Sequence, residues 1–118
     1  HGREVRQTDG VETKQAMSRR SRLEQLIRLY ETGQASDYLD RVLDKAFAQE
    51  AAEEEELISQ LRSDLNEFET RYGMDSSTFY KRFRAGEMGD AMDFMEWASL
   101  YDMHQSAIER LELLTGQL

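Results

Sequence analysis

The sequence predicts an all-α fold, and three observations carry this prediction. The 118 residues contain no proline, so nothing in the composition forbids long helices. Apolar residues recur every three or four positions, which is the period of an amphipathic helix. No stretch alternates apolar and polar residues as a half-buried strand would. We therefore expect a helical hairpin or bundle: a long helix at about 36–72, kinked or straight, then a short helix and a second long helix.

The first helix is expected after a flexible extension. Residues 1–16 show no periodicity and contain two glycines, so we expect an extension there and a single helical domain at 17–118. Residues 18–32 have the pattern of a short amphipathic helix that ends at Gly33. Its apolar residues are spaced by three or four positions: Leu23, Leu26, Ile27 and Tyr30.

The long helix at 36–72 carries more apolar surface than one small chain can hide. A helix of this length spans roughly 55 Å, whereas a compact chain of this size has a radius of gyration of about 13 Å. Either it breaks near 49–56, where like charges crowd, or a second copy covers it. Glu53–Glu56 are expected to form a solvated face, or else a binding site for the basic residues of a partner. Glu54 occupies the position that would join the halves of the apolar line, which comprises Leu39, Leu43, Phe47, Ala51, Ile58, Leu61, Leu65, Phe68 and Tyr72.

Two further helices complete the predicted fold. Gly73 ends the long helix, and the polar residues at 75–77 offer a cap for a short helix at Thr78–Ala85. A last helix follows at about 91–114, with Asp90 as its expected cap. Its wide apolar face is predicted to contain Trp97, Leu100, His104, Ala107, Leu111 and Leu114, with Phe94, Ala98, Tyr101, Ile108 and Leu113 beside them.

Composition and charge narrow the classes of function. The chain has no cysteine, which excludes disulfides and thiolate chemistry. No apolar run approaches a membrane span and no apolar leader is present, so we expect a cytoplasmic protein without membrane contact. The net charge is −9, and the acidic excess lies after residue 28. Such a body is unlike a nucleic-acid binder and attracts basic partners. Nucleic-acid contact stays open only for a basic cluster, which a solvated helix face explains equally well: Arg19, Arg20, Arg22 and Arg28.

Residues with catalytic or ligating chemistry are few. His104 lies on the apolar line of the last helix, where a lone histidine is normally packed and hydrogen-bonded, and no acid–base partner stands at helical spacing from it. Asp90, Asp93 and Glu96 share one face at the start of that helix, which capping and the helix dipole explain. We expect no catalytic, cofactor or metal site, and hence no enzyme.

Aromatic residues and methionines are concentrated in one part of the chain. Eight of its eleven aromatic residues fall between Phe68 and Tyr101, and five of its six methionines fall between Met74 and Met103. These residue types build cores, and they also dominate interface hot spots. Both interpretations stand together, with part of the cluster inside and part turned to a partner. The expected partner-binding residues are Phe79, Tyr80, Phe83, Phe94, Met95, Trp97 and Tyr101.

The segment that contains this cluster resembles a known group of proteins. Residues 68–101 follow the pattern FExRYGMxSSxFYxRFxAGExGDxxDFxEWAxLY. The pattern is similar to a segment of small helical prokaryotic proteins associated with toxin–antitoxin modules, on the antitoxin side. The likeness is close over 65–105 and loose over 20–64. It carries over no catalytic residue, and the DNA-binding strand that such antitoxins often have is not evident here.

The resemblance implies an antitoxin-like interaction module that binds and neutralises a small, basic, toxin-like partner protein. The alternative is a structural homo-oligomeric bundle with no separate partner. On either interpretation we expect a homodimer, because the helices offer more apolar surface than one copy buries.

Overall fold

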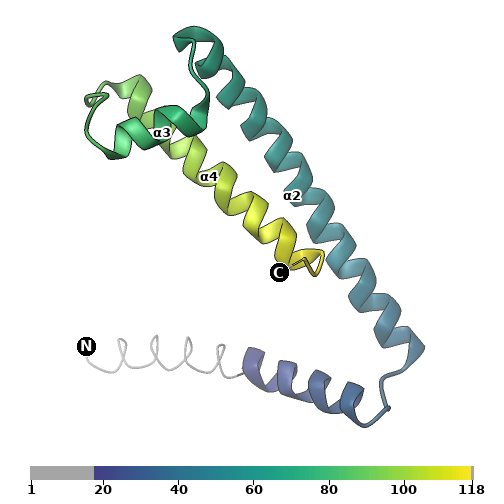
Figure 1. Ribbon diagram of the computed structural model, residues 1–118. Coiled ribbons are helices and arrows are strands. Elements are labelled where there is room, and N and C mark those ends of the chain that lie inside the picture. The colour runs from purple at the N-terminus through teal and green to yellow at the C-terminus, as the bar shows by residue number, and fades with distance from the viewer. Residues whose placement is uncertain (1–17, 118) are drawn as a thin grey trace, which may run out of the picture. The chain divides into compact units, whose positions relative to one another are not determined.

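All regular structure in the described residues, 18–117, is helical, which confirms the predicted fold class. Figure 1 shows the computed structural model of the chain. The chain forms a helix at 18–31, then α2 (Asp37–Tyr72), α3 (Ser76–Arg84) and α4 (Met92–Leu114). No strand occurs within 18–117. The extension expected at 1–16 lies outside the described residues.

The chain divides into two compact units, and the division falls inside α2. The first unit ends at Leu43, and the second comprises Asp44–Leu118. We describe each unit by itself. That 17–118 acts as a single domain stays a prediction.

The first unit contains the helix at 18–31 and the start of α2. The helix is followed by Gly33, whose φ of 70° is readily adopted only by glycine. The Ser36 hydroxyl then accepts a hydrogen bond from the Leu39 amide and so caps α2. The Tyr30 hydroxyl donates to Asp40 over 2.6 Å, which ties the helix at 18–31 to the first turn of α2.

Helix α2 runs without a break for 36 residues, so the break considered near 49–56 does not occur. Its crowded carboxylates have partners that relieve their repulsion. Gln49 donates to Glu53 one turn away, and Arg110 of α4 donates to both Glu50 and Glu54. The expectation of a solvated acidic face is wrong for Glu54, which is buried because α4 and its arginine cover it.

Helix α3 begins earlier than its predicted first residue, Thr78. Gly73, with φ of 64°, ends α2, and Asp75 caps α3 by accepting a hydrogen bond from the Thr78 amide at 2.7 Å. The helix therefore starts at Ser76. The early start places Ser76 inside the unit, where it is buried.

The predicted cap of α4 is wrong. The residue in the N-cap position is Ala91, which makes no side-chain cap hydrogen bond, and Asp90 lies one residue too early. Asp93 provides the negative charge in the first turn, as expected. It also accepts hydrogen bonds from Arg71 and Tyr72, so it fastens the start of α4 to the end of α2.

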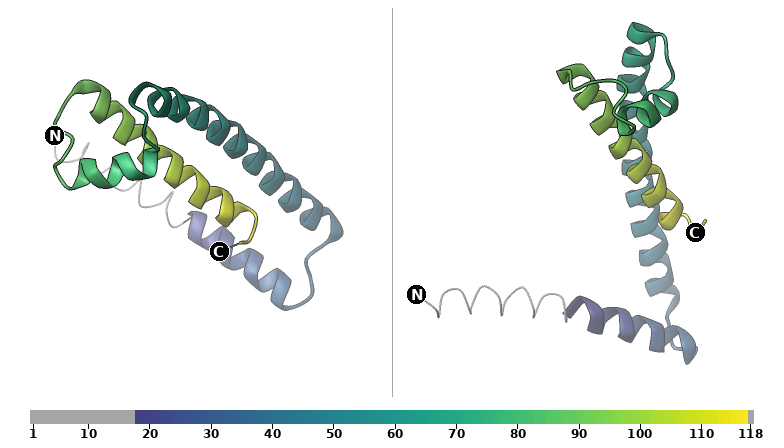
Figure 2. Two further views of the ribbon diagram at one scale, coloured as in Figure 1. Left: turned by 45° about the horizontal axis from the view of Figure 1, so that its top comes forward. Right: turned by 60° about the vertical axis from the view of Figure 1, so that its left-hand side comes forward.

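The second unit is a helical hairpin of α2 and α4, with α3 packed against it. Helix α4 runs antiparallel to the C-terminal part of α2, as the pairs Tyr72–Phe94 and Arg110–Glu54 at its two ends require. Both views in Figure 2 show α3 beside the N-terminal half of α4. The buried core cluster where the three helices meet comprises Leu65, Phe68, Phe79, Trp97 and Ala98.

Candidate protein-interaction surface

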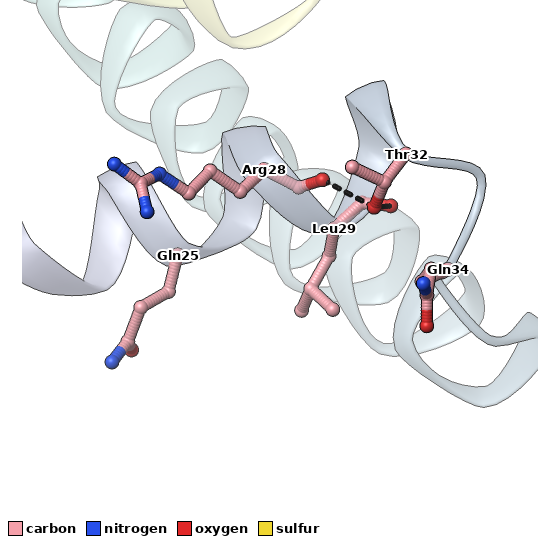
Figure 3. Close-up of a pocket in the computed structure, with 5 residues that line it drawn as sticks. All are labelled: Gln25, Arg28, Leu29, Thr32 and Gln34. Carbon is pink, nitrogen blue, oxygen red and sulfur yellow. Dashed lines mark hydrogen bonds between the residues drawn. The ribbon is translucent and has the colours of Figure 1, made fainter.

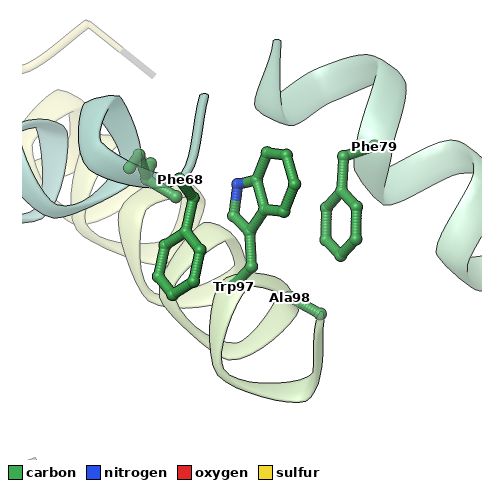
Figure 4. Packing of buried hydrophobic residues seen from close by; sticks show 5 residues of the cluster. Phe68, Phe79, Trp97 and Ala98 are labelled. Atoms are coloured by element: carbon green, nitrogen blue, oxygen red, sulfur yellow. The ribbon is translucent and has the colours of Figure 1, made fainter. Parts of the chain in front are cut away.

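The indole of Trp97 is the centre of the second unit. It has no exposed surface, which confirms its predicted place in the core. Figure 4 shows the indole between the rings of Phe68 from α2 and Phe79 from α3. The Phe79 ring stacks on it at 3.8 Å between centroids and 4° between planes, and the Phe68 ring lies at 5.6 Å and 11°. One side chain of α4 thus joins all three helices.

A chain of hydrogen bonds connects this core to the surface. The Trp97 indole N–H donates to the buried Ser76 hydroxyl at 2.9 Å. Glu69 accepts from the Ser76 amide at 2.8 Å and forms an ion pair with Arg62 at 2.8 Å. Burial alone would raise the pKa of Glu69, but the hydrogen bonds from Ser76 and Arg62 outweigh it and hold that pKa below its usual 4.5. The Glu69 carboxylate is therefore ionised in the folded unit, where it binds the Ser76 amide and Arg62.

His104 borders an open polar pocket beside this network. The pocket has a volume of about 350 Å³, and its lining includes Arg62, Glu69 and three α3 residues, Ser76, Ser77 and Thr78. Burial lowers the pKa of His104, and the positive charge of Arg62 lowers it further, so the neutral ring is favoured at pH 7.

His104 is packed, as predicted, and is 8% exposed. The hydrogen bond expected for it is not found within the described part of the chain. No acid–base pair and no nucleophile–base pair is assembled around its ring there.

The structure brings six of the seven predicted partner-binding residues into one cluster. Phe79 and Trp97 are wholly buried and so cannot meet a partner of the folded unit, which corrects the expectation for these two. The half-buried members have edges that a partner can reach: Tyr80, Phe83, Phe94 and Tyr101. Met95 stands apart from the cluster and is exposed.

Met95 belongs to an exposed apolar stripe along α4, of which only Met95 was predicted from the sequence to bind a partner. Met92 is 81% exposed, Met95 52% and Met103 49%. Offsets of three and eleven residues from Met92 place all three on one side of a helix. Leu113, expected to widen the buried face, is exposed and continues the stripe. We call these four residues the methionine face of α4.

The sequence contained the signal for this face. Its members recur at helical spacing beside the line of Trp97 and not on it, and that spacing could have identified them. Met92 and Met103 were not predicted to bind a partner, and Leu113 was assigned to the buried face.

Carboxylates border the methionine face. Glu96, Asp102 and Glu109 are exposed residues of α4 at positions that flank it. Arg110 also lies on this side of the helix, but its guanidinium turns to Glu50 and Glu54 of α2. The surface therefore carries exposed apolar residues along its middle, with the exposed serines Ser99 and Ser106 between them, and is acidic at its edges.

The first unit has a different surface. The helix at 18–31 exposes apolar side chains, with Leu23 at 60% and Ile27 at 55%, and all four arginines of the basic cluster. A shallow hollow at its C-terminal end is lined by Gln25, Arg28, Leu29, Thr32 and Gln34 (Figure 3). Gln25 and Gln34 lie at opposite ends of the group, and the hydrogen bond drawn there joins Thr32 to the Arg28 carbonyl. This hollow contains no arrangement of acid, base and nucleophile.

The described residues form neither a metal-binding cluster nor a membrane-spanning helix. Residues 18–117 contain no group of three or more histidine, cysteine or acidic side chains that could hold a metal ion. In the same range, the helices lack the combination of length and apolarity needed to cross a membrane.

Comparison of the chain with known protein families, curated proteins and solved structures finds no match. The geometry of the two units is therefore the main evidence on function.

Proposed function

We propose that this chain is an antitoxin-like protein–protein interaction module that binds and neutralises a small basic protein. The observation that carries the proposal is the methionine face of α4, with three methionines between 49% and 81% exposed. Methionine side chains are flexible and polarisable, and they are common on surfaces that bind other proteins. Apolar residues clustered in this way on a small unit are typical of an interaction site.

The charge of the second unit supports a basic partner. The acidic excess of the whole chain, −9, lies in the residues after 28, and carboxylates of α4 flank the methionine face. An acidic rim around an apolar centre attracts a basic protein and speeds its association, while the apolar centre supplies affinity. The resemblance of residues 68–101 to antitoxin-side proteins favours a toxin-like identity for that partner.

Co-purification tests the proposal. The chain, tagged, is expressed together with the product of the small open reading frame beside its gene, and that product is expected to be retained. Met95→Asp with Met103→Asp should abolish retention, because two buried carboxylates would then face an apolar contact. Val42→Asp is the matched control, since Val42 is also an exposed apolar residue of a helix but belongs to the first unit.

The salt dependence and the variants give independent outcomes. Retention should weaken as sodium chloride is raised, because salt screens the attraction between acidic rim and basic partner. A wild-type chain that never retains the neighbouring product contradicts the proposal. Equal retention by Met95→Asp/Met103→Asp and by wild type contradicts the choice of surface.

A bundle that assembles only with itself is the second candidate. It is favoured by further exposed apolar residues on helices other than α4: Leu23, Ile27, Tyr38 and Phe47. Light scattering on the purified chain at tens of micromolar tests it, and a monomer counts against it.

A further inference from the structure

We propose that the basic helix at 18–31 of one copy docks on the acidic middle of α2, residues 47–57, in a second copy. Two such contacts related by a twofold axis would give a homodimer. This contact uses neither the methionine face nor the partner protein proposed above, so it stands or falls independently of that function.

The first argument is the apolar surface on both sides of the contact. Leu23 and Ile27 are more than half exposed and one helical turn apart. On α2, Phe47 is 53% exposed. Phe47 continues the line of Leu61 and Leu65, the line that α4 covers farther along α2. Apolar surface left open along a helix face is stabilised when another helix covers it.

The second argument is charge, which favours a second copy of this chain as the partner of the basic helix. Arg19, Arg20 and Arg22 are exposed on the helix at 18–31, so this helix needs an acidic partner surface. The basic protein proposed for the methionine face would be repelled here. The exposed carboxylate of α2 that lies nearest this face is Glu55, which is about 80° around the helix from Phe47, and Glu53 and Glu56 add negative charge on other sides of the same stretch. The chain thus contains the complement of its own basic helix.

The third argument is register. Arg19 precedes Ile27 by eight residues, and Glu55 follows Phe47 by eight. Both offsets are about 12 Å along a helix. An antiparallel arrangement that sets Ile27 on Phe47 therefore brings Arg19 to Glu55. Arg19 and Arg20 are about 100° apart around the helix axis, so they lie on either side of the Leu23–Ile27 stripe.

Exchange of the charges tests the proposal on the full chain. Variant A carries Arg19→Glu, Arg20→Glu and Arg22→Glu, and variant B carries Glu53→Arg, Glu55→Arg and Glu56→Arg. In each variant alone, like charges meet at both contacts. In a mixed pair, the acidic helix of A meets the basic α2 of B, and the native helix of B meets the native α2 of A.

Sedimentation equilibrium and light scattering measure the result. Wild type is expected to be a dimer at tens of micromolar, and the dissociation constant of A alone and of B alone should rise by about tenfold or more. An equimolar mixture should recover the wild-type dissociation constant as a heterodimer. Circular dichroism checks that both variants remain helical. Leu23→Ser with Ile27→Ser, which leaves every charge in place, should also weaken the dimer.

Three outcomes overturn the proposal. They are a monomeric wild type, a variant A or B that dimerises as tightly as wild type, and a mixture that stays monomeric. Variant A could instead lose the binding of a duplex DNA probe that wild type shows, while its self-association is unchanged. In that case the basic helix binds nucleic acid and not a second copy. Met95→Asp with Met103→Asp should leave the dimer intact. A monomeric wild type that still retains the neighbouring gene product would overturn the dimer and leave the proposed function standing.

Discussion

Removal of the Ser76 hydroxyl is the sharpest test of the core described above. Ser76 is buried, and its oxygen accepts the hydrogen bond from the Trp97 indole N–H at 2.9 Å. In Ser76→Ala the indole donor, which has no exposed surface in the native chain, keeps its place between two stacked rings but loses this acceptor. The alanine also withdraws the hydroxyl that helps to hold Glu69 ionised.

The magnitude follows from the unsatisfied donor. A buried polar group left without its partner costs about 1–3 kcal/mol, and we take about 2 kcal/mol as the loss in free energy of unfolding. In a domain of 60–100 residues, each kcal/mol lowers the thermal midpoint by about 4–8 °C. The expected drop in the midpoint is therefore about 8–16 °C.

A double-mutant cycle followed by circular dichroism provides the assay. Trp97→Phe keeps an aromatic ring in the stack but removes the N–H donor, so Ser76→Ala should cost less in that background than in wild type. Ser77→Ala is the matched control, because Ser77 is the exposed neighbour in the same turn and should change stability by less than about 0.5 kcal/mol. Equal costs for Ser76→Ala in the two backgrounds, or equal costs for Ser76→Ala and Ser77→Ala, would refute the reasoning.

Three other substitutions test the remaining parts of the second unit. Trp97→Ala should lower the free energy of unfolding by about 3–5 kcal/mol, the cost of truncating a large buried aromatic; an unchanged thermal midpoint would place the indole outside the core. Arg110→Ala should lower the thermal midpoint more than Glu109→Ala does, because it leaves the buried Glu54 carboxylate without its cation, and adding Glu54→Leu to Arg110→Ala should restore stability. The lowered pKa of His104 means that the unfolded chain takes up a proton first as pH falls, so stability should decline below about pH 6.5. His104→Gln should flatten that decline in pH-dependent denaturation, and an equally steep decline in the variant contradicts the assignment.

Much of the fold could be predicted because its signals are local. Gly33 and Gly73 adopt the left-handed backbone that ends a helix, and each does so where the apolar period stops. The line of Trp97, His104 and Ala107 on the last helix is buried as the spacing indicated. Such features depend on residues within one or two turns of each other, and sequence spacing reports them directly.

The errors arose where a distant residue decides the environment. Glu54 looked like a member of a solvated run, but Arg110, which is 56 positions away, pairs with it under the cover of α4. The burial of Ser76 depends on Trp97 of α4, which donates to its hydroxyl. Neither Arg110 nor Trp97 can be identified as a partner by spacing along one helix. The start of α3, by contrast, is set locally by Asp75, one of the residues predicted as its cap.

For the candidate site, too, the sequence predicted one part and the packing of the helices decided the other. The sequence singled out seven aromatic and methionine residues, and six of the seven meet in one cluster. It could not tell the buried Phe79 and Trp97 from the exposed Met95, because all three are apolar and follow helical periods. Exposure was decided when α2 and α3 packed on two sides of α4 and left its methionine face open.

By itself, the sequence determined the number and kind of the elements at 18–117, their approximate ends, and the excess of apolar helix surface. Those properties follow from backbone preferences and from a repeat of three to four residues. Only the tertiary structure decided which apolar residues form the core, which carboxylate is buried and which face of α4 meets solvent. Burial is a property of contacts between segments far apart in the chain, and a periodic pattern gives the direction of a side chain without the identity of what lies opposite.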